Sequence, residues 1–399
     1  MRERKRGTVH DLRRENRAAV LWSLYLSQPR SRFELSAATG LSAASVTNVI
    51  RELIGEGVVI ETGLVESDGG RPRAMLGMNP EYGYVIGVDI GETRTRVELF
   101  DLTMTERAKA EYPLDRAAEH DVSVVVGQIA SGLDTVLADS GIGKDAILGV
   151  GIGVPGIIER GPEELVHGQT YGWNAVPLRK LLRAHTDLPL RFDNGAKTMG
   201  QAELWFGAGR GTQNAVMVLI GSGVGASLIS GGATYQGATS SAAEFGHVTV
   251  AVGGRKCRCG ALGCLEAYAG AAAILERYGR PMAARDQELA LAELMDSPEA
   301  AGILDETAGY LGAGIGTLIN LFNPERVILG GWAGLLLGAR LLPEIRESAR
   351  QHSLHHPFAA ASIELGQLGP GAVARGAATL PMESFLNGQD VGNARNDLA

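Results

Sequence analysis

Two segments of the chain share one pattern, in which an apolar strand enters a glycine-rich turn and a second strand leaves it. The first segment, YGYVIGVDIGETRTRVELFDL, covers residues 82–102, and the second, NAVMVLIGSGVGASLISGG, covers residues 214–232. The repetition of such a unit predicts an internally duplicated α/β protein with two lobes. Glycine-rich turns let backbone N–H groups approach phosphates closely, so we expect a ligand between the lobes.

The bulk properties are those of an ordinary globular protein. The 399 residues are enough for two or three domains, and they are 45% hydrophobic and 21% charged. The basic N-terminus is followed by no apolar signal core, and the sequence has no run of about 18 apolar residues. We therefore expect a cytoplasmic protein that does not enter a membrane.

Charge is distributed unevenly along the chain. Residues 1–80 hold 12 Lys+Arg and 9 Asp+Glu, although the whole chain has a net charge of −8. A basic N-terminal arm on an acidic body suits a polyanionic partner at one end of the protein. The alternative interpretation is a solvated tail.

The first part of the chain has the pattern of a helix-turn-helix. Ser31 and Ser42 are suitable N-caps, and Gly40 supplies the positive φ that a tight turn between helices needs. Apolar residues at helical spacing give the segments one shared face. The predicted helices cover residues 12–27, 32–39 and 43–57.

The outward face of the third predicted helix carries small and polar side chains. Such residues suit the major groove of DNA, where Asn pairs with adenine and Arg with guanine or phosphate. The alternative is a three-helix module with no DNA partner. The predicted DNA contacts on this face are Ser42, Ala44, Ser45, Thr47, Asn48 and Arg51.

A hairpin is predicted after the third helix. Apolar stretches at 58–60 and 74–78 flank a polar loop that contains Arg71 and Arg73. Such a hairpin is the wing of a winged helix, and its arginines would contact phosphate or the minor groove. A plain solvated turn is the alternative. Residues 1–80 are thus predicted to be a winged helix-turn-helix domain that binds double-stranded operator DNA.

All three cysteines lie within the stretch CRCGALGC, a short distance after His247. A disulfide between Cys257 and Cys259 would close a small, strained ring, and a nucleophilic cysteine would not need two neighbours. Three thiolates and one imidazole are a closed tetrahedral ligand set for zinc. We therefore predict a structural Zn²⁺ held by His247, Cys257, Cys259 and Cys264.

Six motifs in order give the chain a wider resemblance. They are DIGETR (89–94), GVPG (153–156), FDNGAKTMGQAE (192–203), GSGVGA (221–226), EFGH…CRCGALGCLE (244–266) and VILGG (327–331). Over roughly residues 84–380 the chain resembles the ROK family of repressors, open reading frames and sugar kinases. Its N-terminal winged helix is similar to that of the repressor branch.

This resemblance implies an actin/hexokinase-like α/β fold with two lobes. Lobe 1 would comprise residues 81–200 and be completed by residues 375–399. Lobe 2 would comprise residues 201–374, with the zinc site and an oligomerisation surface.

The resemblance also implies a sugar site. Asp193 matches the segment that holds the catalytic base of the kinases, and Gly156 belongs to a turn near the sugar. Glu244, His247 and Glu266 match residues that contact sugar hydroxyls. The alternative is that both glutamates only brace the zinc ligands.

Several positions depart from the pattern of the kinases. Glu92 stands where the first phosphate loop usually has Gly, Arg94 replaces a lysine, and the bulk of Trp332 would close the adenine side. Phe192 and Thr170 stand where the kinases have Asn. Phe192 is either a stacking partner for a sugar ring or a buried strand residue.

These observations predict a sugar-responsive transcriptional repressor that binds its effector without phosphorylating it. A homodimer or homotetramer is expected, because one short reading head needs a partner half-site. The alternatives are an active ATP-dependent sugar kinase with an appended DNA-binding domain, and a constitutive DNA-binding oligomer that responds to no effector.

Overall fold

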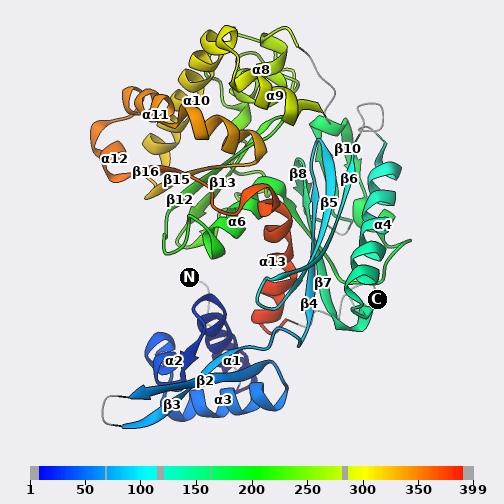
Figure 1. Ribbon diagram of the computed structural model, residues 1–399, viewed down its shortest axis with the longest axis vertical. Helices are drawn as coiled ribbons and strands as arrows, with labels where there is room; N and C mark the ends of the chain where they lie inside the picture. Colours follow the sequence, from blue (N-terminus) through cyan, green and yellow to red (C-terminus); the bar gives the residue numbers. More distant parts are fainter. Residues whose placement is uncertain (1–8, 68–69, 115–120, 162, 281–285, 390–399) are drawn as a thin grey trace.

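The computed structural model describes the chain except residues 1–8, 68–69, 115–120, 162, 281–285 and 390–399. An N-terminal domain, here called the head, lies against a larger two-lobed body (Figure 1). Residues 1–8 of the predicted basic arm and the predicted C-terminal end of lobe 1, residues 390–399, lie outside the described residues.

The head has the predicted winged-helix elements. Ser31 caps the second helix in a capping box with Glu34, and Gly40 ends that helix with a φ of 69°. Ser42 caps the third helix by accepting a hydrogen bond from the Ser45 N–H. Its three-stranded sheet has the order β1-β3-β2. The elements are α1 (Val9–Leu26), β1 (Arg30–Ser31), α2 (Arg32–Thr39), α3 (Ala43–Gly55), β2 (Val59–Ser67) and β3 (Gly70–Met78).

The two sheets of the body confirm the duplication. One has the order β11-β7-β4-β5-β6 and the other β16-β15-β12-β13-β14, so each contains the same antiparallel hairpin and the same two parallel strands. We call the first sheet with its helices lobe 1 and the second lobe 2. The strands of lobe 1 are β4 (Tyr84–Ile90), β5 (Arg94–Asp101), β6 (Glu106–Pro113), β7 (Ile147–Val154) and β11 (Leu190–Asn194). Those of lobe 2 are β12 (Ala215–Ile220), β13 (Val224–Ser230), β14 (Ala233–Thr234), β15 (Arg326–Gly330) and β16 (Ser362–Leu365).

Smaller elements complete the body. Lobe 1 carries a three-stranded sheet of the order β10-β9-β8 next to the cleft. Its elements are β8 (Ile157–Glu159), β9 (Leu165–Gly168), β10 (Trp173–Val176) and α5 (Leu178–Leu182). The helices of lobe 2 are α7 (Glu266–Ala269), α8 (Ala271–Arg277), α9 (Gln287–Met295), α10 (Ala301–Phe322), α11 (Trp332–Gln351) and α12 (His355–Ala360).

Helix α4 (Val122–Ser140) covers the outer face of the lobe 1 sheet. It is long and apolar enough to cross a membrane by length and composition alone. However, Val125, Ile129 and Val136 are fully buried in the apolar core of lobe 1. The helix is therefore a core element of this fold.

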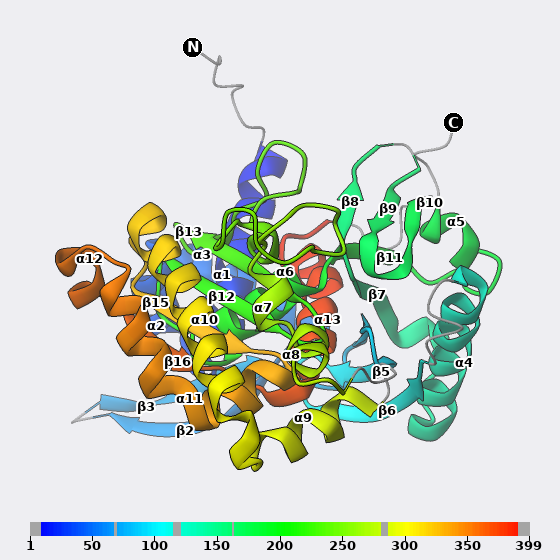
Figure 2. The ribbon, with the colours of Figure 1, turned by 90° about the horizontal axis from the view of Figure 1, so that it is seen from above.

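Helices α6 (Gly195–Phe206) and α13 (Ala372–Leu386) pack together between the two sheets (Figure 2). Glycines in the sheet allow this close approach, because a Cβ on Gly87 would lie 1.9 Å from the Ala374 carbonyl oxygen. A Cβ on Gly151 would lie 1.7 Å from the Ala377 carbonyl oxygen. The C-terminal helix α13 thus packs on the lobe 1 sheet, although it follows lobe 2 in the sequence.

The head and the body share an apolar core. Trp22 in α1 meets the ring of Trp205 edge to face at 5.0 Å, and its Nε1–H donates to Asn387 Oδ1 at 2.8 Å. Tyr25 also contacts the rings of Trp205 and Phe206. The ends of α6 and α13 that point away from the cleft therefore support α1.

Candidate functional site

A cavity of about 460 Å³ lies between the lobes. The turn between β4 and β5 borders it from lobe 1, and the turn between β12 and β13, with Gly221, Ser222 and Gly223, borders it from lobe 2. Both glycine-rich turns therefore meet at one cleft, as their repetition predicts. The cavity also borders the cysteine-rich loop, through Cys259 and His247.

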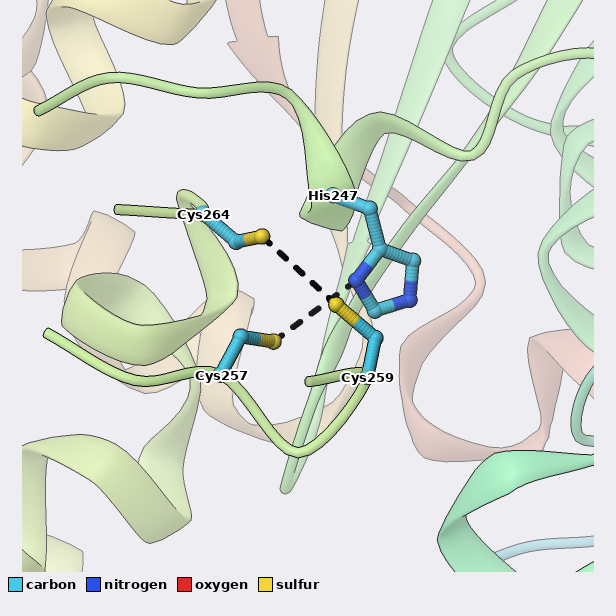
Figure 3. A group of neighbouring side chains, drawn as sticks. All are labelled: His247, Cys257, Cys259 and Cys264. Carbon is cyan, nitrogen blue, oxygen red and sulfur yellow. Dashed lines mark hydrogen bonds between the residues drawn. The ribbon is translucent and has the colours of Figure 1, made fainter. Parts of the chain in front are cut away.

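The three cysteines and His247 form one cluster at the edge of this cavity. Their ligand atoms all lie within 4.8 Å of one another, and the side chains point toward a common centre (Figure 3). The Cys259 and Cys264 sulfurs are 3.7 Å apart, and Cys257 Sγ lies 3.7 Å from His247 Nδ1. The His247 Nε2 atom is on the side of the ring away from the cluster.

The cluster fits a tetrahedral ion. Two sulfur ligands at about 2.3 Å from a tetrahedral Zn²⁺ lie about 3.8 Å apart, close to the observed spacing. Burial raises the pKa of the Cys257 thiol to about 12, so without a cation this thiol stays protonated. The four residues could therefore hold a metal ion.

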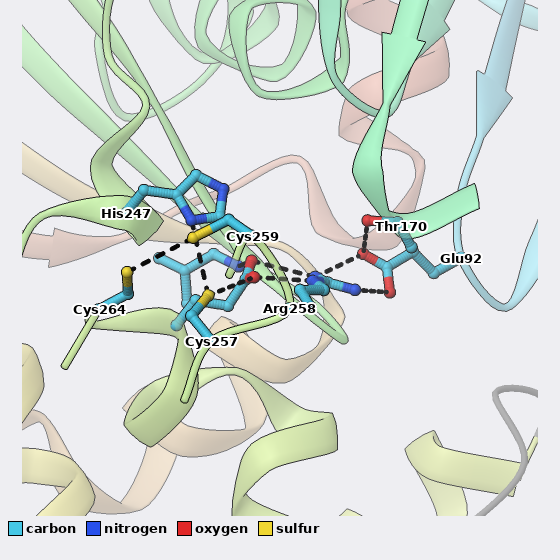
Figure 4. Close-up of polar contacts among 9 residues, drawn as sticks. Glu92, Thr170, His247, Cys257, Arg258, Cys259 and Cys264 are labelled. Atoms are coloured by element: carbon cyan, nitrogen blue, oxygen red, sulfur yellow. Dashed lines mark hydrogen bonds and ion pairs between the residues drawn. The ribbon is translucent and has the colours of Figure 1, made fainter. Parts of the chain in front are cut away.

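Arg258, between two of the cysteines, joins the cluster to the first glycine-rich turn (Figure 4). Its guanidinium donates to both oxygens of Glu92 at 3.0 Å and to both oxygens of Glu266 at 2.7 and 3.0 Å. Burial disfavours the charged guanidinium, but the two carboxylates outweigh this and raise the pKa of Arg258. Thr170 donates a further hydrogen bond to Glu92 at 3.2 Å.

Glu266 and Glu244 differ in their surroundings. Glu266 accepts the two Arg258 bonds and one from the Val224 N–H at 3.0 Å. Burial raises its pKa, but the Arg258 bonds outweigh burial and hold the pKa below the ordinary value. Burial raises the pKa of Glu244, and within the described part of the chain its carboxylate has no side-chain hydrogen-bond partner. Glu244 is thus the more available of the two for a ligand hydroxyl.

Asp193 lies beside the cavity and is held by neighbouring polar groups. Its Oδ2 accepts from the Gln236 side-chain amide at 3.1 Å, and Oδ1 accepts from the Asn194 N–H at 2.8 Å. Arg160 lies 4.0 Å from Oδ2. The segment borders the cavity with Asn194, Gly195 and Ala196. Each oxygen accepts one hydrogen bond, so the carboxylate keeps acceptor capacity beside the cavity.

Lys197 was not anticipated from the sequence. Its Nζ donates to Gln236 Oε1 at 2.9 Å and to the Ser240 carbonyl at 2.6 Å. Burial lowers the pKa of Lys197, and the carboxylates of Asp193 and Glu244 oppose this effect only in part. Its place in the motif FDNGAKTMGQAE, directly after the Asp193 segment, is the signal that could have identified it.

Of the other positions expected on the ligand side, some border the cavity and one is buried in the core. Gly156 borders the cavity, and Trp332 lies over the second glycine-rich turn, 3.3 Å from where a Cβ of Gly221 would be. Phe192 is buried in the core of lobe 1, with the Arg179 guanidinium over its ring. Of the two interpretations of Phe192, the structure therefore favours the buried strand residue. Arg94 pairs with Glu288 of lobe 2.

The face of α3 that is predicted to contact DNA is largely accessible to solvent. Ser42, Ala44, Asn48 and Arg51 are exposed, whereas Ser45 and Thr47 are half-buried. Arg51 donates to Asn48 at 3.1 Å, which pre-orients both polar groups. In the wing, the Arg73 guanidinium lies over the Phe33 ring at 5.1 Å. The side chain of Arg71 lies outside the described residues.

Two duplicated lobes around a ligand-sized cleft, preceded by a winged helix-turn-helix, define a two-lobed α/β protein of the actin/hexokinase class. The family described as "ROK family" matches residues 85–383, and the chain belongs to this family.

Known proteins of both functional branches are similar to the chain. It is 29% identical to the xylose repressor of Caldicellulosiruptor bescii, over 94% of this chain and 97% of the relative. A crystal structure of a ROK family transcriptional regulator, homologous to the Escherichia coli Mlc protein, covers 96% of this chain and all of its own, with 25% identity and a TM-score of 0.77. The ROK family glucokinase of Streptomyces griseus, solved with glucose and AMPPNP, covers only 75% of this chain and 99% of its own, with 27% identity and a TM-score of 0.62.

Proposed function

We propose that this protein is a sugar-responsive transcriptional repressor that acts in the cytoplasm. The head would bind operator DNA through α3, and the cavity would bind a sugar or sugar-derived effector. The observation that carries the proposal is the apolar core shared by head and body, which includes the Trp22–Trp205 contact. Because the head packs on α6 and α13, a change in the cleft can alter how the head is held.

The effector would be held by groups that suit sugar hydroxyls. Glu244 accepts hydrogen bonds, and His247 offers one ring nitrogen on the side away from the cysteines. Glu266, Gly156 and the Asp193 segment would shape the rest of the site. This effector set is a proposal supported by their positions around or beside the cavity.

A structural Zn²⁺ would be held by His247, Cys257, Cys259 and Cys264. The ion would crosslink the cysteine loop and fix the orientation of the His247 ring. The spacing of the sulfur and nitrogen atoms supports this proposal.

Residues 1–80 would form the DNA-binding domain. Residues 81–200 with 375–399 would form lobe 1, and residues 201–374 lobe 2. A homodimer or homotetramer would place two heads on two half-sites, because one head covers only a short stretch of the major groove.

Phosphoryl transfer is the second candidate function, and similarity to a glucokinase favours it. Against it, Arg258 pairs with the Glu92 carboxylate within the first glycine-rich turn, where a nucleotide phosphate would have to bind. Incubation with ATP and a monosaccharide panel would decide between the two functions. Turnover of about 1 per second or more would establish a kinase.

The main experiment identifies operator and effector together. Genomic DNA fragments retained by the full chain would be sequenced, and release of the strongest fragment would be measured with D-xylose, D-glucose and other monosaccharides. The proposal expects one sugar to weaken operator binding at least tenfold. Retention of one DNA sequence with no response to any sugar would instead support a constitutive DNA-binding oligomer.

A further inference from the structure

Two charged side chains at the first glycine-rich turn form ion pairs across the cleft with residues of lobe 2. Glu92 accepts from Arg258, whose loop belongs to lobe 2, through both of its carboxylate oxygens. Arg94, two positions later, pairs with Glu288 of α9. The two ion pairs have opposite polarity, since one carboxylate and one guanidinium come from each lobe.

The Arg258 guanidinium lies between the two glycine-rich turns. A Cβ on Gly223, in the second turn, would lie 2.0 Å from Arg258 Nη2, so the guanidinium packs directly on that backbone. On the side of the first turn, the guanidinium contacts the Glu92 carboxylate. A phosphate that bridged the N–H groups of both turns would need the space that this ion pair occupies.

The Glu92–Arg258 pair has the features of a strong ion pair. The Arg258 and Glu92 side chains are only 32% and 21% exposed, and the contact is bidentate. Bidentate arginine–carboxylate contacts are stronger and more directional than single surface contacts. Glu266 holds Arg258 from the other side, so the guanidinium is already oriented before it meets Glu92.

We propose that Glu92 and Arg258, together with Arg94 and Glu288, form an inter-lobe latch that replaces phosphate binding in this chain. The Glu92 carboxylate serves as an internal anion at the turns. Glu92 and Arg258 thereby determine the ligand class, since the cleft admits a neutral saccharide and excludes a nucleotide polyphosphate. The assignment of the saccharide rests on the proposed function, whereas the latch rests on contacts between residues of the chain itself.

Hydrogen exchange of the full chain without ligand tests the latch. In Glu92→Ala, we expect backbone exchange in peptides that cover residues 221–226 and 255–260 to rise at least fivefold, because the contact that closes the cleft over them is lost. Glu288→Ala should accelerate exchange in residues 91–94 in the same way. Both variants change exposed or half-buried side chains, so the fold should be retained.

Glu111→Ala is the matched control. Glu111 pairs with Arg94 at 3.4 Å and with Arg96 at 2.9 Å, but all three residues belong to lobe 1. Its loss removes a carboxylate from the same arginine without breaking a contact across the cleft. If Glu92→Ala and Glu111→Ala give the same exchange in residues 221–226, the latch proposal is wrong.

A second measurement tests the ligand class. Millimolar Mg-ATP should leave exchange of residues 91–94 in the unmodified chain unchanged within twofold. Protection of these residues by Mg-ATP would overturn the exclusion of nucleotide. If no sugar of the panel releases operator DNA, the proposed function is contradicted. That outcome would not change the interpretation of the two exchange experiments.

Discussion

Replacement of Trp22 by alanine should undock the head from the body. The substitution removes the edge-to-face contact with Trp205 at 5.0 Å and the hydrogen bond to Asn387 at 2.8 Å. An aromatic pair of this kind is worth about 1 kcal/mol, and the hydrogen bond contributes about 1 kcal/mol more. With the apolar area that the indole ring covers, we expect the docking free energy to fall by about 3 kcal/mol.

Hydrogen exchange measures this docking in the full chain. A loss of about 3 kcal/mol corresponds to roughly two decades in the opening equilibrium. Peptides over residues 20–26 and 202–207 should therefore exchange about 100-fold faster in Trp22→Ala, while peptides over lobe 2 strands stay protected. Tyr25 and Phe206 would remain to hold part of the interface.

Two controls separate docking from general destabilisation. Trp22→Phe keeps an aromatic ring and loses the hydrogen bond, so its exchange should rise only about fivefold. Leu64→Ala removes an apolar side chain of the head that is 72% exposed and should change nothing at the interface. If Trp22→Ala exchanges no faster than Trp22→Phe, the apolar interface does not hold the head and the reasoning fails.

Three further predictions concern the body. Cys259→Ser should remove bound zinc and lower the unfolding temperature of the body by more than about 10 °C, since a structural zinc contributes several kcal/mol, whereas Val252→Ala in the same loop should not. Metal analysis and calorimetry check this, and a zinc-free variant of unchanged stability would contradict it. Glu244→Gln should weaken sugar binding at least tenfold by calorimetric titration, because a charged acceptor is lost, and unchanged affinity would place the sugar elsewhere. Burial raises the pKa of Glu98 to about 7, so the folded chain keeps a proton that the unfolded chain loses, and stability should fall as pH rises from about 4.5 to 7. Glu98→Gln should flatten that slope in urea unfolding at several pH values, and an unaltered slope would assign it to other groups.

Local signals in the sequence were sufficient for much of the fold. Ser31, Gly40 and Ser42 predicted the helix boundaries of the head, because capping and positive φ depend on a few adjacent residues. The repeated strand–turn–strand units predicted the duplication, because each unit is built from neighbouring residues. The metal-ligand cluster around Cys257 could be predicted for the same reason, because its three cysteines lie on one short loop.

The contacts that give the site its character could not be predicted this way. The sequence showed Glu92 as a departure from the first phosphate loop, but only the structure shows that its carboxylate pairs with Arg258, a residue 166 positions away. Asp193 was expected at the ligand, and only the structure shows that Gln236, 43 positions away, donates to its carboxylate. The pattern of a strand shows which residues alternate, but it does not show which distant loop will meet a side chain at the strand's end.

The sequence by itself determined the winged head, the two lobes and a cysteine–histidine cluster, because helix caps, turns and short ligand loops are set by residues close together in the chain. Only the tertiary structure decided that Arg258 forms ion pairs with both Glu92 and Glu266 and that Trp22 packs on Trp205. Those contacts join segments from separate elements. They depend on how the two lobes and the head pack against one another, and this packing is driven by the burial of apolar surface across the whole molecule.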